Sequence, residues 1–481
     1  MNDAARTVKH GRASRSLIDD GIAIWNAGLQ AVRGDEVTES SIQFDDAGSL
    51  VTIGDQCIDV RRFPKINVFG GGKACGGMLR GLARAFRDRV KLTGLVHTVA
   101  ADSNQVGGVD DIGGVHLLYA REMGSNQPNE LIVQSTRRMR RLVGESDAET
   151  WTIFLISGGG SALLCDPAEG LTLADLLGIA SDLTDQAADI NDLNAIRSRL
   201  DRIKGGGLLA DVRGGIATTL VISDILGDSL PVIASGPTIG PSPNSAERER
   251  EDARVQRLVR QFDADGRWPS TARKRLLEPE HRPIPDAATN GSALTRHECV
   301  MLANNPVAVD AAGIEAERRG YNHIMHCHRS TEGLAEAVGR RMAGMLLQMA
   351  DSPSAHRHDA LIEGGEPTVN LCNSQVRGRG GRNLQCVLAA YLEIVRRHAG
   401  DFPPLFLMSA GTDGEDGTSD AAGGYISREV HHRMRDADVD AETCLRTNNA
   451  HHWFERAAAL LVTGPTGTNV CDVRVGLVGR S

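Results

Sequence analysis

The chain contains 481 residues, of which 41% are hydrophobic and 24% are charged, so it is long enough for two or three domain-sized cores. Its formal net charge of -9 at pH 7 excludes nucleic acid and anionic membranes as partners of the surface as a whole. Any site that binds phosphate must therefore be local.

Apolar residues at helical spacing predict a first helix over residues 17–32, and Gly34 supplies its stop. A strand at residues 66–70 and a helix at residues 78–86 follow, with a glycine-rich turn between them. Further strands, mostly separated by helix-length segments, are predicted at residues 92–99, 151–156, 218–223, 299–303, 322–326, 360–363 and 405–409. Strands that alternate with helices predict mainly parallel sheets covered on both faces.

A segment rich in proline, alanine and turn-forming residues, 279–293, separates the two patterned halves. We expect the domain boundary there, with one α/β domain over residues 1–290 and a second over residues 295–481. No apolar run approaches the roughly 18 residues of a membrane span, and the nine cysteines include no CxxC pair. These features predict a cytoplasmic protein with reduced thiols.

The first glycine-rich motif is GGGKACGGM at residues 70–78. The main-chain N–H groups of Gly71 and Gly72 are candidates for binding a phosphate at a helix N-terminus, and Lys73 adds a mobile positive charge. The motif is not a Walker A loop, because Ala74 stands where that motif needs Ser or Thr. It matches the loose glycine spacing of dinucleotide folds, but no acidic residue ends the next predicted strand. A purely structural turn is the alternative.

The second motif, ISGGGSALL at residues 156–164, runs from a strand into three glycines and a serine. This pattern again directs backbone amides at an anion, with a hydroxyl at a helix start. Three glycines precede Ser161 and Ala162 follows it, so the motif is not a nucleophile elbow and does not predict a covalent serine mechanism. The nucleotide-binding candidates here are Ser157, Gly158, Gly159, Gly160 and Ser161.

Two pairs of charged residues follow in the first half of the chain. Arg197 and Lys204 are seven residues apart, about two helical turns, so both could face an anionic ligand; a solvated basic face is the alternative. Asp224 directly follows a predicted strand, and Asp228 lies four residues on. Carboxylates at strand ends suit Mg²⁺, although either one could equally cap a turn.

The second half contains further glycine-rich loops. In GRGGRN, Arg379 and Arg382 lie in a loop that opens a helix, a natural site for a carboxylate or a transferring phosphoryl group. In TDGEDG, three carboxylates including Asp413 lie close together among glycines. Like charges at that spacing need a cation or an acid–base task.

Taken together, these strings resemble the class II glycerate 2-kinase family, whose C-terminal part is called the MOFRL domain. The resemblance runs from about Ser16 to Val475 and includes GGGKA, ISGGGSALL, NAIRSRLDRIKGG, SDILGDSLPVIASGPT, GGEPTV, GRGGRN, TDGEDGTSDAAGG and TGPTGTNVCD. It implies a Rossmann-like N-terminal domain and a MOFRL-type C-terminal domain around an active-site cleft. The implied reaction transfers the γ-phosphate of ATP to the 2-hydroxyl of D-glycerate, with Mg²⁺ as the metal.

The resemblance also implies roles for single residues. Lys73 and Arg382 match the positions assigned to catalysis in the family, and Asp224 joins them as a carboxylate that holds Mg²⁺ or orients the acceptor hydroxyl. Lys204 and Asp228 are expected on the nucleotide side, and Asp413 is a second candidate metal ligand. The residues expected to bind substrate are Arg197, Arg379, Asn383, Asp413 and His451.

The chain departs from the family pattern at several positions. Asn126 and Asn129 stand where the family has His and Asp, Gln385 replaces a common Glu, and Ala450 and His451 replace Asp and Ser. These changes predict that D-glycerate is turned over less well than a bulkier or less acidic hydroxylated compound.

Other functions remain as alternatives. They are a kinase of another hydroxy or sugar acid, a nucleotide-binding pseudokinase regulator, and a nicotinamide-dependent oxidoreductase. The expected partner is a small hydroxy acid, with no nucleic acid and no membrane, and a homodimer is left open.

Overall fold

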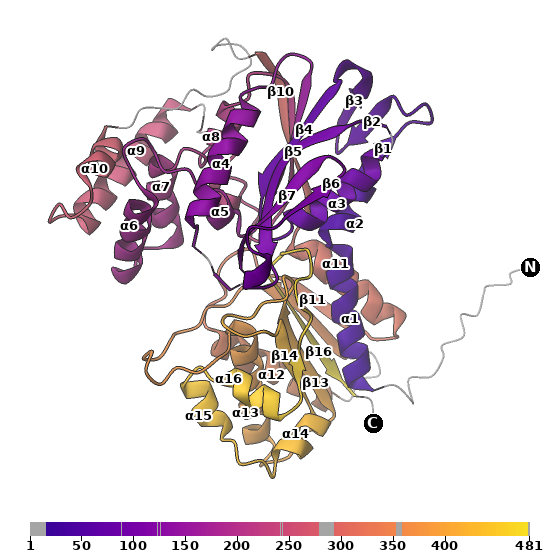
Figure 1. The fold of residues 1–481 in the computed structure, drawn as a ribbon. Helices are drawn as coiled ribbons and strands as arrows, with labels where there is room; N and C mark the ends of the chain where they lie inside the picture. The colour runs from indigo at the N-terminus through magenta and orange to yellow at the C-terminus, as the bar shows by residue number, and fades with distance from the viewer. Residues whose placement is uncertain are drawn as a thin grey trace, which may run out of the picture. The chain divides into compact units, whose positions relative to one another are not determined.

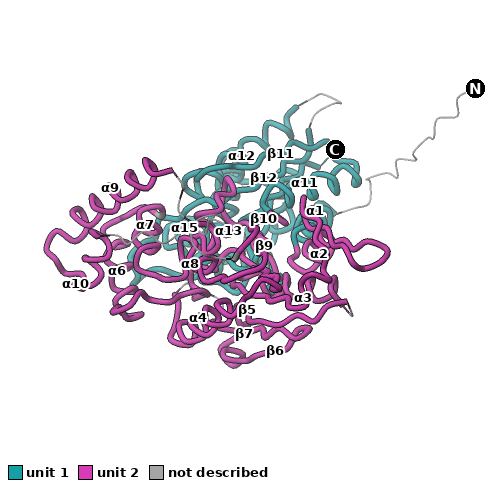
Figure 2. The backbone as a smooth tube through the Cα atoms, turned by 90° about the horizontal axis from the view of Figure 1, so that it is seen from above, with its two compact units in different colours: residues 1–32, 304–466, 470–481 teal, residues 33–303, 467–469 magenta. Residues whose placement is uncertain are grey.

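The structure of this protein is a computed structural model. It describes residues 16–87, 89–122, 124–125, 127–240, 242, 244–278, 293–352 and 358–479. They form two compact units (Figure 2). Unit 2 contains Arg33–Ala303 and Gly467–Asn469, and unit 1 contains the residues up to Val32, Asn304–Thr466 and the residues from Val470 on. No helix of the described segments is long and apolar enough to cross a membrane.

Two elements lie in a different unit from the one that their sequence position suggests. Helix α1 (Leu17–Ala31) belongs to unit 1, where it packs on α11 (Asn305–Arg318). Strand β10 (Ala293–Ala303) belongs to unit 2, because it pairs in parallel with β9 (Gly214–Ile222). The predicted boundary, residues 279–293, lies outside the described residues except for its last residue.

Unit 2 is built on a seven-stranded sheet with the order β10-β9-β8-β4-β5-β7-β6 (Figure 1). Every neighbouring pair is parallel except β6 and β7. Every residue of β8 and β9 is buried, as expected for parallel strands covered on both faces. The strands not yet delimited are β4 (Lys65–Gly71), β5 (Leu92–Ala100), β6 (Val109–Ile112), β7 (Val115–Glu122) and β8 (Thr150–Ser157).

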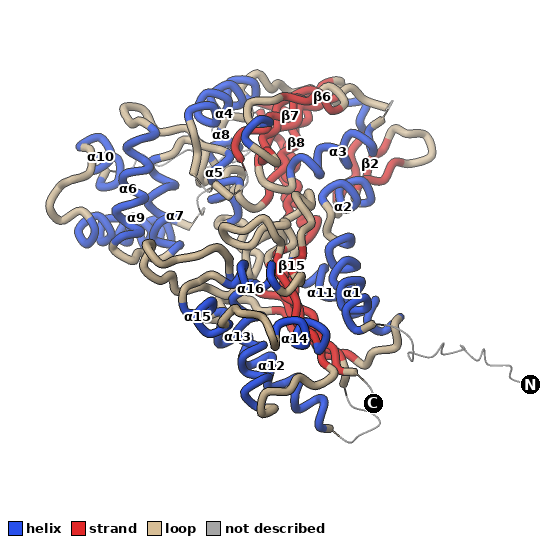
Figure 3. The backbone as a smooth tube through the Cα atoms, turned by 60° about the horizontal axis from the view of Figure 1, so that its bottom comes forward, coloured by secondary structure: helices blue, strands red, loops and turns tan. Residues whose placement is uncertain are grey.

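The helices of unit 2 divide into two groups. Crossover helices α3 (Cys75–Phe86) and α4 (Glu130–Val143) connect β4 to β5 and β7 to β8. A second group stands apart from the sheet, as Figures 1 and 3 show; it consists of α6 (Leu173–Asp185), α7 (Ile190–Leu200), α9 (Ser245–Phe262) and α10 (Ser270–Leu277). These helices share a hydrophobic core of their own. The smaller elements are α2 (Gly34–Ser40), α5 (Gly160–Leu163), α8 (Gly207–Ala210) and an antiparallel sheet of β1 (Ile42–Phe44), β2 (Leu50–Ile53) and β3 (Gln56–Asp59).

The strand order of unit 2 creates a topological switch point. From β4 the chain continues to β5 and β7 on one side, and it then returns to β8, β9 and β10 on the other. The connections therefore diverge at the carboxyl ends of β4 and β8. In open α/β sheets this divergence opens the crevice in which ligands bind.

Unit 1 contains a six-stranded sheet with the order β11-β12-β16-β13-β14-β15. β11 and β12 are parallel, whereas the last strand, β16 (Asp472–Val478), is antiparallel to both of its neighbours, β12 and β13. The predicted α/β class with two domains is confirmed, and the antiparallel insertion of β16 is a feature that the alternation of elements did not indicate. The other strands are β11 (His323–Cys327), β12 (Ala360–Gly365), β13 (Leu405–Gly411), β14 (Gly423–Ser427) and β15 (Leu460–Leu461).

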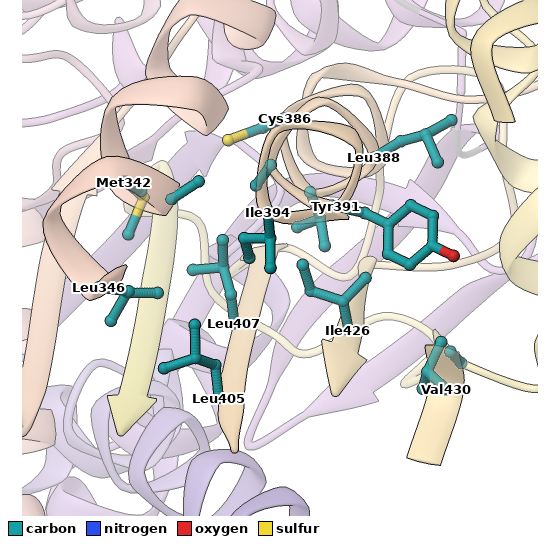
Figure 4. Close-up of a cluster of buried hydrophobic side chains, with 14 of the residues drawn as sticks. Met342, Leu346, Cys386, Leu388, Tyr391, Ile394, Leu405, Leu407, Ile426 and Val430 are labelled. Atoms are coloured by element: carbon teal, nitrogen blue, oxygen red, sulfur yellow. The ribbon is translucent and has the colours of Figure 1, made fainter. Parts of the chain in front are cut away.

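One hydrophobic core holds the helices between residues 335 and 457 on the sheet of unit 1 (Figure 4). Met342 of α12 (Ala335–Asp351) and Ile394 of α13 (Arg382–Arg397) are fully buried beside Leu407 of β13. Complete burial of a side chain of this size stabilises the fold by about 1.5–3 kcal/mol. The remaining helices are α14 (Arg428–Met434), α15 (Ala441–Arg446) and α16 (Ala450–Arg456).

A buried histidine connects three elements of unit 2. His97 of β5 is fully buried, with Nδ1 2.8 Å from the carbonyl oxygen of Leu163 in α5 and Nε2 2.7 Å from the hydroxyl of Ser135 in α4. Burial lowers the pKa of His97 to about 4, because the charged form would lose its hydration. The imidazole is therefore neutral at physiological pH.

This burial makes the stability of unit 2 depend on pH. In the unfolded chain His97 takes up a proton near its ordinary pKa of 6.5, whereas the folded protein resists it down to about 4. The stabilising contribution is thus complete above pH 6.5 and is lost as pH falls toward 4. Between pH 7 and pH 5 we expect a loss of about 2 kcal/mol from this residue.

Urea denaturation of the wild type and His97→Gln at both pH values measures this effect. The variant should be less stable at pH 7 but should lose less stability on acidification. His116→Gln, at an exposed position of β7, is the control. Equal losses on acidification in the wild type and His97→Gln would contradict the assignment.

Candidate active site

The two glycine-rich motifs of the first half form one structure at the switch point. β4 and β8 are neighbours with Gly71 opposite Ile156, so their loops leave the sheet side by side. The backbone N–H of Lys73 donates to the carbonyl oxygen of Gly158 at 2.8 Å, and the N–H of Ala74 donates to Ser157 Oγ at 3.0 Å. Segments more than 80 residues apart are thus fixed against each other.

This close contact requires glycine at several positions, because a side chain there would collide with the neighbouring segment. A Cβ at Gly72 would lie 2.1 Å from Ser157 Oγ, and a Cβ at Gly158 would lie 1.9 Å from Asp224 Oδ2. Similar contacts surround Gly71, which faces Leu164, and Gly160, which faces Ala234. Ser157 is fully buried, so it positions the turn of Lys73 and is not exposed to a ligand.

Two cationic side chains meet over Gly159. This glycine has φ 75°, and a Cβ there would lie 3.0 Å from Lys73 Cγ and 3.5 Å from Arg121 Nη2. Arg121, at the end of β7, is 2% exposed and donates from Nη1 to the carbonyl oxygen of Glu122 at 3.0 Å. The loop after β8 therefore faces two positive charges, which suits a polyanion such as a phosphate chain.

Asp224 lies beside this loop, just after β9. Its Oδ2 accepts a hydrogen bond from Asn469 Nδ2 at 3.1 Å, and the carboxylate packs against Gly158. Asp228, four residues on, has a left-handed backbone with φ 54°. Because Mg²⁺ in phosphate sites often takes only one or two carboxylates besides phosphate oxygens and water, the position of Asp224 fits a Mg²⁺ ligand.

Two further candidates of unit 2, Lys204 and Ser161, form hydrogen bonds within the protein. Lys204 is 4% exposed, and its ammonium donates to Asp201 Oδ2 at 2.6 Å and to the carbonyl oxygens of Ser161 and Leu164 at 3.2 and 3.3 Å. This geometry favours a role in positioning the loop over direct contact with a nucleotide. Ser161 Oγ lies 2.8 Å from the Oγ of Ser235.

Arg197 is placed differently from Lys204, although the two were expected on one helix face. Arg197 lies in α7, whereas Lys204 follows that helix and its ammonium donates to Asp201. Burial lowers the pKa of Arg197, an effect that nearby Cys165 and Asp201 oppose. Among the residues that the structure describes, the Arg197 guanidinium has no hydrogen bond or ion pair.

In unit 1 the first residue of α13, Arg382, is held by carboxylates. Its Nε and Nη2 donate to the two oxygens of Asp472 at 2.6 and 3.0 Å, and Nη1 lies 3.0 Å from Glu366 Oε1. Burial disfavours the charge, but these carboxylates and Asp413 outweigh it and raise the pKa of Arg382. The guanidinium is thus held in one orientation, with one further N–H on each of Nη1 and Nη2 that could donate to a ligand.

Asn383 and Asp416 fix Asp472 and the first turn of α13 through hydrogen bonds. The Asn383 side chain is fully buried and donates to Asp472 Oδ1 at 3.0 Å, while its carbonyl oxygen accepts from Ser409. Asp416 accepts from the N–H groups of Asn383 and Leu384 at the start of α13, and burial raises the pKa of Asp416 to about 6. The geometry of Asn383 favours positioning Asp472 over contacting a substrate.

Two other candidate residues of unit 1, Arg379 and His451, meet at one carboxylate. Arg379 Nη2 and His451 Nε2 lie 3.1 and 2.9 Å from Asp420 Oδ1, and the N–H of His451 donates to the carbonyl oxygen of Arg379. Asp413 is half-buried, and its Oδ1 accepts from the N–H of Glu415 at 3.0 Å. The structure thus brings together Arg379 with His451.

Several departures from the family pattern have local structural roles. Asn129 caps α4 by accepting from the N–H of Ile132 at 2.9 Å. Gln385 is buried and donates to Glu336 and to the carbonyl oxygen of Leu445, and Ala450 is fully buried. Asn126 lies outside the described residues.

One cluster has the spacing of a metal site, but its charge is already balanced. His328, Glu332 and Glu363 could each offer an atom to one cation. However, Arg474 donates to both oxygens of Glu332 at 2.8 and 2.9 Å, and Arg341 makes a bidentate pair with Glu363. Within the described ranges no group of three ligands includes Asp224 or Asp413.

Comparisons with known proteins agree with this architecture. Residues 21–277 match a family model described as a domain of unknown function, DUF4147, and residues 359–472 match the MOFRL family. The D-glycerate 2-kinase of Thermotoga maritima is 32% identical over 362 residues, covering 74% of this chain and 79% of that protein. A putative hydroxypyruvate reductase of Agrobacterium vitis is 32% identical over 413 residues, covering 86% of this chain and 99% of that protein.

A solved structure extends the similarity to the fold. The crystal structure of glycerate kinase from Thermotoga maritima superposes with a TM-score of 0.75 at 27% identity, covering 96% of this chain and 99% of that one. Fold and site thus define an α/β protein of the glycerate kinase type. The chain belongs to the class II glycerate 2-kinase family, with a C-terminal MOFRL domain.

Sequence reasoning missed several residues of these sites. Asn469 and Asp472 lie in TGPTGTNVCD, and Glu366 lies in GGEPTV, so motifs had marked their segments but not their roles. Arg121 lies in no motif; only the pairing of β5 with β7 brings it to the loop after β8.

Gly159→Ala tests whether the position of Lys73 depends on this glycine. The added Cβ would press on Lys73 Cγ at 3.0 Å, and the left-handed backbone would be strained. Lys73 is a candidate catalytic residue, and misplacing a catalytic group by about 1 Å can cost on the order of 100-fold in rate. We therefore expect the turnover number of the enzyme to fall by about that factor in Gly159→Ala. Gly400→Ala shares the left-handed backbone, with φ 95° and nothing within 4 Å, and should retain activity. Equal activity in Gly159→Ala and Gly400→Ala would show that the position of Lys73 does not depend on Gly159.

Proposed function

We propose that this protein is an ATP-dependent kinase that transfers the γ-phosphate to a hydroxyl of a small hydroxy acid, with D-glycerate as the reference substrate. The observation that carries the proposal is the convergence of Lys73, Arg121 and the loop 158–161 at the switch point of the unit 2 sheet. Phosphoryl transfer requires mainly positioning and neutralisation of charge, and this is what the loop and its cations supply.

In unit 2 the chain's own groups would bind the donor. The backbone N–H groups of the loop 158–161 face the phosphates, Lys73 and Arg121 neutralise their charge, and Lys204 holds the loop through the carbonyl oxygens of Ser161 and Leu164. Asp224, and Asp228 after it, would hold Mg²⁺, which when bound neutralises further charge on phosphate oxygens. Asn469 keeps the Asp224 carboxylate oriented.

In unit 1 we propose that Arg382 binds the transferring phosphoryl group or the acceptor carboxylate. Asp472 and Glu366 fix its guanidinium before any ligand arrives, so little side-chain entropy is lost on binding. Arg379, His451 and Asp413 are the proposed substrate contacts of this unit, and Arg197 is the proposed contact of unit 2.

D-glycerate is kept as the reference substrate, because the described residues that depart from the family pattern do not themselves point to another substrate. Asn129, Gln385 and Ala450 have structural roles that account for them without a substrate. The sequence-based prediction that D-glycerate is a poor substrate therefore stays a prediction. The nine cysteines are all free thiols, which supports the cytoplasm as the proposed compartment.

A reductase is the second candidate, because one relative bears the name putative hydroxypyruvate reductase. In dinucleotide folds an acidic residue near the end of the second strand binds the ribose. Here Asp102 follows β5, but its carboxylate caps a turn by accepting from the N–H groups of Asn104 and Gln105 at 2.8 and 3.2 Å. This use of the carboxylate disfavours a nicotinamide cofactor.

Release of ADP from ATP and Mg²⁺ across a panel of acids tests the proposal. The panel is D-glycerate, hydroxypyruvate and four- to six-carbon sugar acids, with NADH oxidation as a parallel assay. We expect ADP release with at least one hydroxy acid, and a decrease of about 100-fold or more in Lys73→Ala and in Arg382→Ala.

Lys91→Ala, at an exposed position before β5, should retain full turnover. Circular dichroism checks that each variant is folded. NADH oxidation without ADP release would favour the reductase, and a clear preference for D-glycerate would remove the prediction of an altered substrate.

Asp224→Asn tests the metal site. An amide is a weaker ligand than a carboxylate, so the Mg²⁺ concentration for half-maximal activity should rise by about 10-fold or more. Binding of Mn²⁺ in the presence of ADP, followed by electron paramagnetic resonance, gives a readout that does not depend on turnover. Unchanged metal affinity in Asp224→Asn would shift the assignment to Asp228 or Asp413.

A further inference from the structure

A large cavity in unit 2 lies beside helices α7, α9 and α10. Figures 1 and 3 show that these helices stand apart from the sheet. Residues of α7, α9 and α10 and of the segment after β9 line it, and its volume is about 790 Å³. Sites for drug-sized ligands typically enclose about 300–1,000 Å³. A hydroxy acid of three or four carbons would leave most of this space empty, so the cavity fits a larger molecule.

The cavity is connected to the loop 158–161 through one serine. Ser235 lines the cavity, and its Oγ lies 2.8 Å from Ser161 Oγ and 3.1 Å from Asn194 Oδ1, which also lines it. Ala234 and Ser235 have φ 52° and 60°, a conformation that costs a non-glycine residue energy and is typical of ligand sites. This strained backbone places the Ser235 hydroxyl between the loop and the cavity wall.

The chemistry of the wall suits a neutral polar molecule with an apolar face. Pro231 and Val232 contribute apolar surface, and Asn191 and Asn194 contribute amides. Arg199 and Arg254 at the wall are already paired, with Asp252 and with Asp192. The wall also carries the charged side chains of Glu247, Arg248, Glu251, Lys274, Arg275 and Glu278, so it presents hydrogen-bonding groups and charges of both signs.

One wall residue could donate to a ligand. Arg275 of α10 lines the cavity, and its guanidinium forms no ion pair within the part of the chain that the structure describes. A ligand hydroxyl or ring nitrogen at the wall could accept a hydrogen bond from this guanidinium.

We propose that this cavity binds the nucleoside of the phosphate donor, while the loop 158–161 binds its phosphates. This inference rests on the proposed kinase function. The base would lie against the apolar surface with its polar edge toward the amides, and Arg275 would donate to a ribose hydroxyl or a ring nitrogen. Ser235 and Ser161 mark the point where nucleoside and phosphates join.

Ser198→Phe tests the proposal by filling the cavity from α7. We expect the KM for ATP to rise by about 10-fold or more, with the KM for the acceptor acid and kcat at saturating ATP unchanged. In a thermal-shift assay the stabilisation by ADP should be lost, whereas that by inorganic tripolyphosphate, which has no nucleoside, should persist. The matched control is Ser181→Phe, the same substitution at an exposed position of α6.

Arg275→Gln is the second variant, for use if Ser198→Phe does not fold. Loss of one hydrogen bond should raise the KM for ATP by about 3- to 10-fold and leave tripolyphosphate binding intact. Stabilisation of the wild type by ADP together with unchanged ADP binding in both variants would overturn the nucleoside site alone. Absence of any ADP effect on the wild type would overturn the proposed kinase function and the nucleoside site together.

Discussion

The parallel pairing of β4 with β8 is the constraint on which the rest of the candidate active site depends. It places two glycine-rich segments side by side at the switch point, where the hydrogen bond from Lys73 N–H to the Gly158 carbonyl joins them. Once the loops are joined, the Lys73 side chain must pass over Gly159, where Arg121 also arrives from β7. An anion site then follows from sheet topology, because three strands deliver their loops to one edge.

In unit 1 the structure has to stabilise the partly buried positive charge of Arg382. A guanidinium in partly buried surroundings is costly unless carboxylates surround it, and Asp472 and Glu366 do so for Arg382. The carboxylates in turn need donors, which Asn383 supplies from the first turn of α13. Removing one member would leave the others buried without compensation, so the cluster behaves as one unit.

The helices α7, α9 and α10 give unit 2 a second kind of surface. The loop 158–161 presents amides and cations suited to phosphate, whereas the cavity beside α7 presents amides, apolar side chains and charged groups of both signs. Ser235 connects the two through Ser161 and Asn194. A ligand with a charged end and a neutral end would match this division.

The sequence by itself determined the α/β class, the glycine-rich loops and the candidates Lys73, Asp224 and Arg382, because these depend on local pattern and on motifs. It also placed α1 within a residue of its observed end. It did not determine the position of Arg121, the insertion of β16 or the unit to which α1 belongs. Nor did it distinguish Lys204 and Asn383, whose polar groups bond internally, from ligand contacts. Only the tertiary structure decided these, because strand pairing and burial join residues that are distant in sequence.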